Sequence, residues 1–201
     1  KWLMGWRDIT NTTNERSVIS SVIPIAACSD TFLLMFPKIS NKSICCGLLA
    51  DQTSLVHDYI LRQKIGGTHL KYHYKKQGTY LPPSTYDKNA IDFIRPRVLE
   101  LTYTNQDLKY WAEELGFYGQ PFTFNPERRA LLRAELDAFY AHLYGLNRED
   151  LRYILDPSDV MGPDYPSETF RVLQKNEIRQ FGEYRTKKLV LTKWNELFGE
   201  Q

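Results

Sequence analysis

The second half of the chain carries a succession of helix start and stop signals, and this pattern limits the fold most. Asn125-Pro126-Glu127 offers an N-cap, a proline for the first helical position and an acid for the first turn. An apolar stripe at helical spacing follows, and Gly145 ends it. A helix is also predicted over residues 87–101, where Pro96 implies a kink or two short pieces. Two more are predicted to start at a Thr104–Asp107 capping pattern and at Asn147, the latter ending at Leu155. The last two are predicted after a cap at Ser167 and around Leu189, Trp194 and Leu197.

The first half instead shows β-branched and apolar runs of strand length. Residues 17–23 are rich in Val and Ile and end at Pro24, which strands tolerate at their ends or edges. Residues 31–36 predict a second strand buried on both faces, and residues 43–49 are a candidate third. A helix is predicted from about Ser54 to a left-handed glycine stop at Gly66-Gly67.

After that glycine pair, apolar and basic residues alternate. Leu70, Tyr72 and Tyr74 are interleaved with Lys71, His73 and Lys75, a pattern typical of a half-buried strand with a cationic outer face. The chain is therefore predicted to be α+β. A small mixed β-rich unit over residues 1–83 is followed by a helical support unit over residues 84–201.

The net charge of +2 conceals an asymmetry between the two halves. Residues 1–86 hold ten Lys and Arg against five Asp and Glu, whereas residues 87–201 hold sixteen against nineteen. An anion-binding surface is therefore expected in the first half.

Three cysteines, Cys28, Cys45 and Cys46, argue against a disulfide framework and predict buried thiols in a reducing, cytoplasmic compartment. Apolar runs such as residues 32–36 are too short for a membrane span, and no signal peptide is recognisable. The abrupt start at Lys1 is interpreted as a fragment boundary.

The span from Tyr59 to Tyr86 is the strongest local indication of function. It has no Asp or Glu, and five tyrosines are interleaved with its basic residues. Such side chains can neutralise a phosphate backbone, while exposed backbone N–H groups at a glycine pair can approach it closely. The alternative is a solvated strand face whose tyrosines belong to the core. The candidate DNA contacts in this span are Arg62, Lys64, Gly66, Gly67, Thr68, His69, Lys71, His73, Lys75 and Lys76.

A polar loop over residues 7–16 is a second candidate for DNA contact, although turn-forming Asn and Thr explain it almost as well. Its candidate residues are Arg7, Asn11, Thr12, Asn14 and Arg16. His69 and His73 lack a third ligand nearby, so no metal site is predicted. No nucleophile elbow, phosphate-cradling glycine loop or nuclease carboxylate arrangement is present, so no catalytic residue is predicted.

Several blocks of the sequence resemble one family in the same order. In the first half they are residues 4–10, 14–19, 22–24, 48–59, 62–70 and 77–83, and in the second half residues 138–146, 151–156, 168–173 and 182–186. The chain resembles the target-recognition and C-terminal region of large restriction–modification methyltransferases. These include type IIG enzymes and the adenine methyltransferases of BREX phage-defence systems, and type I specificity subunits end similarly at Leu81-Pro82-Pro83.

The resemblance implies a parent that methylates adenine in double-stranded DNA with S-adenosylmethionine, and it allows for a nuclease domain in the same parent. The Asn/Asp-Pro-Pro-aromatic motif that would hold a flipped base is missing, since Leu81-Pro82-Pro83-Ser84 lacks both flanking groups. The chain itself is therefore expected to be a non-catalytic, cofactor-free recognition fragment of a bacterial cytoplasmic enzyme. Its expected partners are DNA and the methyltransferase domain of the same parent, with no membrane involved.

Two other hypotheses stay open. The aromatic and basic segment could dock an acidic partner or the methyltransferase core, which would make the chain a protein-interaction module. A nuclease is the other, and the lack of a carboxylate cluster argues against it.

Overall fold

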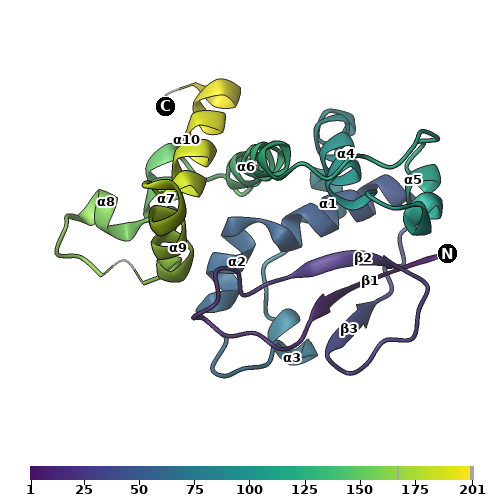
Figure 1. Ribbon diagram of the computed structural model, residues 1–201, viewed down its shortest axis with the longest axis horizontal. Helices are drawn as coiled ribbons and strands as arrows, with labels where there is room; N and C mark the ends of the chain where they lie inside the picture. Colours follow the sequence, from purple (N-terminus) through teal and green to yellow (C-terminus); the bar gives the residue numbers. More distant parts are fainter. Residues whose placement is uncertain (167, 200–201) are drawn as a thin grey trace.

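The computed structural model describes residues 1–166 and 168–199 and has an α+β fold in which a small antiparallel sheet is joined to a larger helical part (Figure 1). The strands are β1 Trp2–Arg7, β2 Ser20–Pro24 and β3 Phe32–Met35. The helices and 3-10 turns that follow are α1 Lys42–Thr53, α2 Leu55–Arg62, α3 Tyr72–Lys75, η1 Pro83–Thr85, α4 Lys88–Thr102, η2 Gln106–Leu108, α5 Lys109–Glu114, α6 Pro126–Leu143, α7 Arg148–Leu155, α8 Pro157–Met161, α9 Arg171–Phe181 and α10 Arg185–Phe198.

The sheet has the order β2-β1-β3, and both outer strands run antiparallel to β1. Gly5 pairs with Ser21 on one side and with Leu34 on the other. A Cβ atom at Gly5 would lie 2.3 Å from the Leu33 carbonyl oxygen, so only glycine fits at this crossing. The central strand β1 was not predicted from the sequence. The predicted burial of β3 on both faces is wrong, because Leu33 alone is buried in this edge strand.

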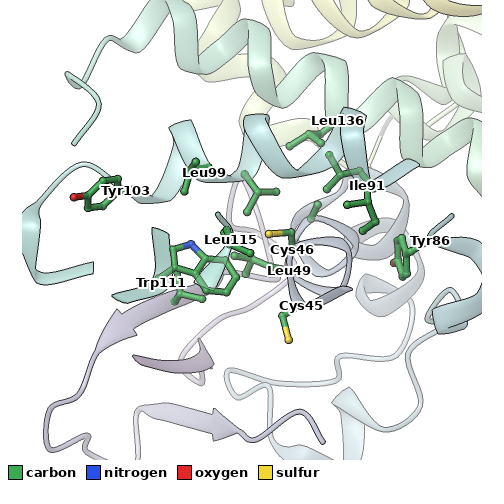
Figure 2. Close-up of a cluster of buried hydrophobic side chains, with 14 of the residues drawn as sticks. Cys45, Cys46, Leu49, Tyr86, Ile91, Leu99, Tyr103, Trp111, Leu115 and Leu136 are labelled. Carbon is green, nitrogen blue, oxygen red and sulfur yellow. The ribbon is translucent and has the colours of Figure 1, made fainter. Parts of the chain in front are cut away.

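The main core lies between the sheet, α1, α4, α5 and α6 (Figure 2). Met4 and Val22 of the sheet meet Cys46 of α1, Ile94 of α4 and Trp111 of α5, and each of these side chains is buried. Residues from both sides of position 83 therefore share one core. The division of the chain near residue 83 remains an interpretation.

Two further clusters complete the interior. One packs α2 against α6, α7 and α10 through Leu55, Ala138, Leu151 and Val190. The other packs the sheet residue Trp6 against the end of α2 and the segment after it. In Figure 1, α6 lies between the layer formed by α1 and α4 and the group α7 to α10, which sits away from the sheet.

The helix signals of the second half are largely confirmed. The Asn125 side chain accepts a hydrogen bond from Arg128 N at the start of α6, and Asn147 forms a capping box with Asp150 at the start of α7. Gly145 follows α6 with φ +76°. Three details differ: Asn105 rather than Thr104 caps η2, Pro96 lies within one continuous helix, and the predicted cap at Ser167 lies outside the described residues.

Two predictions around α1 and α2 are wrong. Residues 43–49 belong to α1 instead of a strand, because the Asn41 side chain caps the helix at Ser43 N and the apolar residues wrap into the core. A short apolar run cannot by itself distinguish a strand from a buried helix. The glycines after α2 are not its left-handed stop, because α2 ends at Arg62 with Gln63 in the right-handed region, and neither Gly66 nor Gly67 has a positive φ.

The predicted cationic strand over residues 70–75 is also wrong. Residues 72–75 form the short helix α3, in which Lys76 N donates to the Tyr72 carbonyl at 2.9 Å. Trp6 Nε1 donates to the Leu70 carbonyl at 2.7 Å and ties this segment to the sheet. Because a helical turn brings Lys75 to the inner side, the alternating pattern does not produce a basic outer face.

The thiols behave as expected at two of three positions. Cys45 and Cys46 are buried in α1, where burial raises the pKa of both thiols, and Figure 2 shows their side chains pointing in different directions. Cys28 is partly exposed. Within the described part of the chain, no helix combines the length and the apolar composition that crossing a bilayer requires.

Candidate nucleic-acid interface

The two segments singled out in the sequence lie side by side. Thr10 N donates to the Thr68 carbonyl at 2.9 Å, and Leu70 N donates to the Asp8 carbonyl at 2.7 Å. An isolated antiparallel bridge joins Ile9 to His69 between these bonds. The loop over residues 8–16 and the loop over residues 63–70 therefore form one continuous surface, which we call the paired-loop surface.

Asp8 organises this surface from beneath. Its side chain is 1% exposed, and its Oδ2 lies 2.9 Å from Lys71 Nζ and 2.6 Å from His69 Nδ1. Burial alone would raise the pKa of Asp8, but the hydrogen bonds and charges of Lys71 and His69 outweigh it and hold the pKa below its usual value. Lys71 is thus placed at the predicted surface, but its charge is already partly neutralised.

Other predicted contacts are open to solvent. Lys64, Lys76 and Arg7 are exposed and form no salt bridge with any residue of the ranges 1–166 and 168–199. The turn between them is open as well, since a Cβ atom at Gly67 would meet nothing within 4 Å. Cations without counter-charges beside an accessible backbone are suited to phosphate oxygens. The exposed candidates are Arg7, Thr12, Lys64, Gly66, Gly67, Thr68, His69, His73 and Lys76.

Arg62 is not a surface residue, so its predicted phosphate contact is corrected. Its side chain is 3% exposed and pairs with Asp58, one helical turn earlier, at 2.9 Å. The two terminal guanidinium nitrogens donate to the backbone carbonyls of Thr12, Asn14, Glu15 and Thr169. Arg62 therefore holds the paired-loop surface in place from inside and offers no N–H group to a ligand.

The predicted phosphate contact of Lys75 is also wrong, but here the buried group lacks partners instead of having many. It is 3% exposed, and its Nζ has no hydrogen-bond partner among the described residues. The Nζ lies 5.5 Å from the Trp6 ring centroid and 5.9 Å from that of Tyr80. Burial lowers the pKa of Lys75 to about 7, against the opposing effect of Asp51 and Asp58. A lysine enclosed in this way does not contact DNA.

The polar side chains of the first loop serve the loop itself. Asn11 Oδ1 accepts from the backbone N and the hydroxyl of Thr13, and Asn14 Nδ2 donates to the Thr10 hydroxyl at 3.2 Å. Arg16 Nη2 donates to the Thr53 carbonyl and pairs with Asp137 at 3.4 Å. Turn formation therefore accounts for Asn11 and Asn14, as the alternative interpretation held.

Some tyrosines of the span from Tyr59 to Tyr86 belong to the core, as the alternative interpretation of that span held. Tyr86 is buried, and the Tyr80 hydroxyl donates to the Lys75 carbonyl at 2.9 Å. Tyr72 is 46% exposed, and its hydroxyl donates to the Leu34 carbonyl. Among the described residues, no group of three or more His, Cys, Asp and Glu is arranged to hold a metal ion, and the His73 ring lies against that of Tyr74 at a tilt of 42°.

A basic hollow on another side of the first loop was missed from the sequence. It has a volume of about 590 Å³ and is lined by arginines from two distant parts of the chain: Arg7 at the end of β1 and Arg16 in the first loop, and Arg129 and Arg133 on α6. The spacing of Arg129, Arg133 and Asp137 at every fourth position could have indicated a charged face of α6. The loop that completes the hollow lies more than a hundred residues earlier and gives no such signal.

Comparison of the chain with family models, with curated proteins and with solved structures gives no match.

Proposed function

We propose that the chain is the DNA target-recognition part of a bacterial, cytoplasmic adenine methyltransferase of the restriction–modification or phage-defence type. The observation that carries the proposal is the pairing of the two loops, which joins two separately identified polar and basic segments into one surface. Lys64 of the second loop is exposed and forms no salt bridge with any described residue, and the same holds for Lys76 and Arg7 outside the two loops. The resemblance to restriction–modification methyltransferases supplies the DNA and the methyltransferase domain as partners.

In this proposal the chain recognises DNA and does not catalyse methyl transfer. S-adenosylmethionine would be bound by the methyltransferase domain of the parent. The exposed cations would contact phosphates, and the exposed side chains of Thr12 and Thr68 in the two loops, with His73 of α3, would be available to base edges or sugars. Arg62 and Asp8 would act only by positioning the loops from below.

The proposal is tested by measuring binding to a short labelled duplex of mixed sequence by fluorescence anisotropy over a range of salt concentrations. The double variant Lys64→Ala/Lys76→Ala is expected to bind more weakly. Its log–log salt dependence should flatten by about two units, because each lost phosphate contact removes about 0.9 from the slope. Circular dichroism should show an unchanged fold, since both side chains are exposed.

The control is Lys88→Ala/Lys109→Ala, which removes two lysines of the helical part whose side chains are 88% and 61% exposed. It should leave the affinity and the slope close to those of the unaltered chain. Duplex binding that is undetectable at low salt, or a slope that the first double variant does not change, would remove the DNA-recognition proposal.

A second candidate, docking on another protein, is favoured by one observation. β2 and β3 run in the same direction and finish at the same end of the sheet. The residues just beyond them, Ile25 and Phe36, are 67% and 70% exposed. Exposed apolar side chains at one sheet end are suited to a protein contact. Binding of the purified chain to the methyltransferase domain, weakened by Phe36→Ser but not by the lysine variants, would support this function.

A further inference from the structure

The basic hollow differs from the paired-loop surface in shape and chemistry. β2, α1, α4 and α6 form its walls, and the end of the first loop forms its rim. Its apolar lining includes Leu49, Val98, Leu101 and Leu136, and hydroxyl groups of Ser20 and Thr102 lie among them. At about 590 Å³ the hollow is within the size range of small-molecule sites.

The positive charge inside the hollow exceeds the negative charge. Four arginines line it, against two acids, Glu15 and Asp137. Asp137 is already committed, because its Oδ1 accepts from Leu55 N at 2.7 Å and its Oδ2 pairs with Arg16. Glu15 accepts a hydrogen bond from Asn176. The excess corresponds to two positive charges, which is the charge that a phosphate monoester would neutralise near pH 7.

Arg133 is the group in this hollow most in need of an anion. It forms no hydrogen bond or salt bridge with any residue in the described part of the chain. Its side chain stays accessible to solvent although protein surrounds it, as expected of a group that lines a hollow. Burial, followed by the charges of Arg16 and Arg129, lowers the pKa of its guanidinium, and Asp137 offsets this only in part.

Arg16 also has unused donor capacity. Its Nη2 is bonded to Thr53 and Asp137, but its Nη1 is buried and has no hydrogen-bond partner among the described residues. Two neighbouring arginines outside the hollow have carboxylate partners by contrast: Arg128 binds both carboxylate oxygens of Glu100, and Arg97 pairs with Glu135. The hollow therefore places Arg133, which has no carboxylate partner among the described residues, beside Arg16, which has a buried free donor.

We infer that this hollow binds a small molecule through a phosphate monoester group, which Arg133, Arg16 and Arg129 would hold while the apolar walls contact the rest of the molecule. Planar guanidinium groups match phosphate oxygens in a bidentate geometry. A monoester rather than a backbone phosphodiester is indicated by the double positive excess, because a phosphodiester carries only one negative charge. The inference goes beyond DNA recognition and does not depend on it.

The test uses inorganic phosphate as the probe, with chloride at matched ionic strength as its reference. Phosphate is expected to raise the Tm of the unaltered chain and to bind in isothermal titration calorimetry. Arg133→Gln should weaken phosphate binding at least tenfold. In the absence of phosphate it should raise the Tm slightly, because the repulsion from Arg16 and Arg129 is relieved. The control Arg128→Gln, on the same helix but paired with Glu100, should keep the phosphate response.

In the phosphate experiment, either of two results would overturn the inference. One is the absence of any phosphate-specific response, and the other is a full response in Arg133→Gln. Should Arg133→Gln not fold, Arg133→Lys keeps the charge but loses the fork, and it should still bind phosphate more weakly.

Measurement of duplex binding distinguishes a small-molecule phosphate from the phosphates of the DNA backbone. A small-molecule site predicts that Arg133→Gln leaves duplex affinity and its salt slope unchanged. A slope lowered by about one unit would instead assign Arg133 to the DNA backbone and exclude the small-molecule site. The Lys64→Ala/Lys76→Ala variant should keep its phosphate response, so failure of the DNA proposal and failure of this one can be distinguished.

Discussion

Arg62 and Lys75 are both buried cations from the same aromatic and basic segment, yet the protein treats their charges in opposite ways. Arg62 uses all its guanidinium N–H groups, with Asp58 on one edge and four backbone carbonyls on the other two nitrogens. Lys75 makes no hydrogen bond through Nζ with any described residue. The two side chains are about equally inaccessible, at 5% and 3% exposed, so burial itself does not distinguish them.

The difference follows from the chemistry of the two groups. A guanidinium keeps its proton inside a protein, so burying it requires a partner for each donor. The partners of Arg62 come from the first loop and from Thr169, which makes Arg62 a link between distant segments. An ammonium group can release its proton instead, and burial lowers the pKa of Lys75 to about 7. A buried arginine thus indicates a structural junction, and a buried lysine without partners indicates a destabilising charge.

The largest effect is expected from Arg62→Met. The variant would leave the Asp58 carboxylate buried with only the Ser17 and Val18 N–H groups as donors, and it would release the first loop from Thr169. Removing one partner of a buried ion pair costs about 3–5 kcal/mol in the free energy of unfolding. Urea denaturation at pH 7 measures this loss. The neighbouring exposed variant Lys64→Met should change the stability by less than about 0.5 kcal/mol. A loss below about 1 kcal/mol in Arg62→Met would mean that Arg62 is not a junction.

Features that depend on residues close together in the sequence could be predicted, and features that depend on distant contacts could not. Helix starts at Asn125 and Asn147 depend on residues within one turn, so local signals were sufficient. The α+β class followed from the same signals. Residues 43–49 and 70–75 were assigned wrongly because short apolar or alternating runs fit a strand and a helical turn equally well.

The candidate site was predictable only in part, for a related reason. The exposed cations Lys64, in the second loop, and Lys76, directly after α3, could be identified from composition. The burial of Lys75 depends on Trp6, and that of Arg62 depends on Thr169, contacts that span long stretches of sequence. The basic hollow likewise needs α6 to meet the first loop, and no local pattern encodes that meeting.

An intermediate effect of the opposite sign is expected from Lys75→Met. Methionine keeps the length of the side chain and removes a buried, unpaired amine, so the variant should be more stable by about 1–3 kcal/mol near pH 6. Thermal and chemical denaturation would measure the gain. The loss of any charge attraction to Asp51 and Asp58 is included in this estimate, because both acids oppose the lowering of the Lys75 pKa only in part. A variant less stable than the unaltered chain would show that Lys75 is effectively paired.

The gain should depend on pH in a direction fixed by the pKa of Lys75. Its folded value is about 7 and its ordinary value is 10.5, so between these pH values the unfolded chain binds more protons. The stability contribution of Lys75 therefore rises with pH across this interval. The advantage of Lys75→Met should be greatest below pH 7 and disappear above about pH 10.5. Unfolding experiments at pH 6, 7.5 and 9 would detect the trend, and an advantage that grows with pH would contradict it.

The smallest effect on stability is expected at Asp8. Its carboxylate has more partners than the Lys75 ammonium but fewer than the Arg62 guanidinium. Asp8 is buried, but Lys71 is 40% and His69 53% exposed, so water screens much of the attraction. Asp8→Asn should cost about 1 kcal/mol or less at pH 7, because the amide oxygen can still accept one hydrogen bond. The folded pKa of Asp8 lies below 3.8, so its contribution is present above that pH and is lost as the pH falls through the folded value. The stability of Asp8→Asn should therefore fall less than that of the unaltered chain as the pH is lowered through this range.

Asp8→Asn also links the buried charges to the proposed function. It removes the carboxylate that pairs with Lys71, so that this partly exposed lysine keeps more of its positive charge uncompensated. Duplex binding should therefore become tighter and more dependent on salt, with the log–log slope steeper by about one unit. Asp92→Asn, which frees the equally charged but distant Lys88, is the control and should leave the slope unchanged. If Asp8→Asn weakens duplex binding instead, the ordering of the paired loops by Asp8 matters more to DNA than the charge of Lys71.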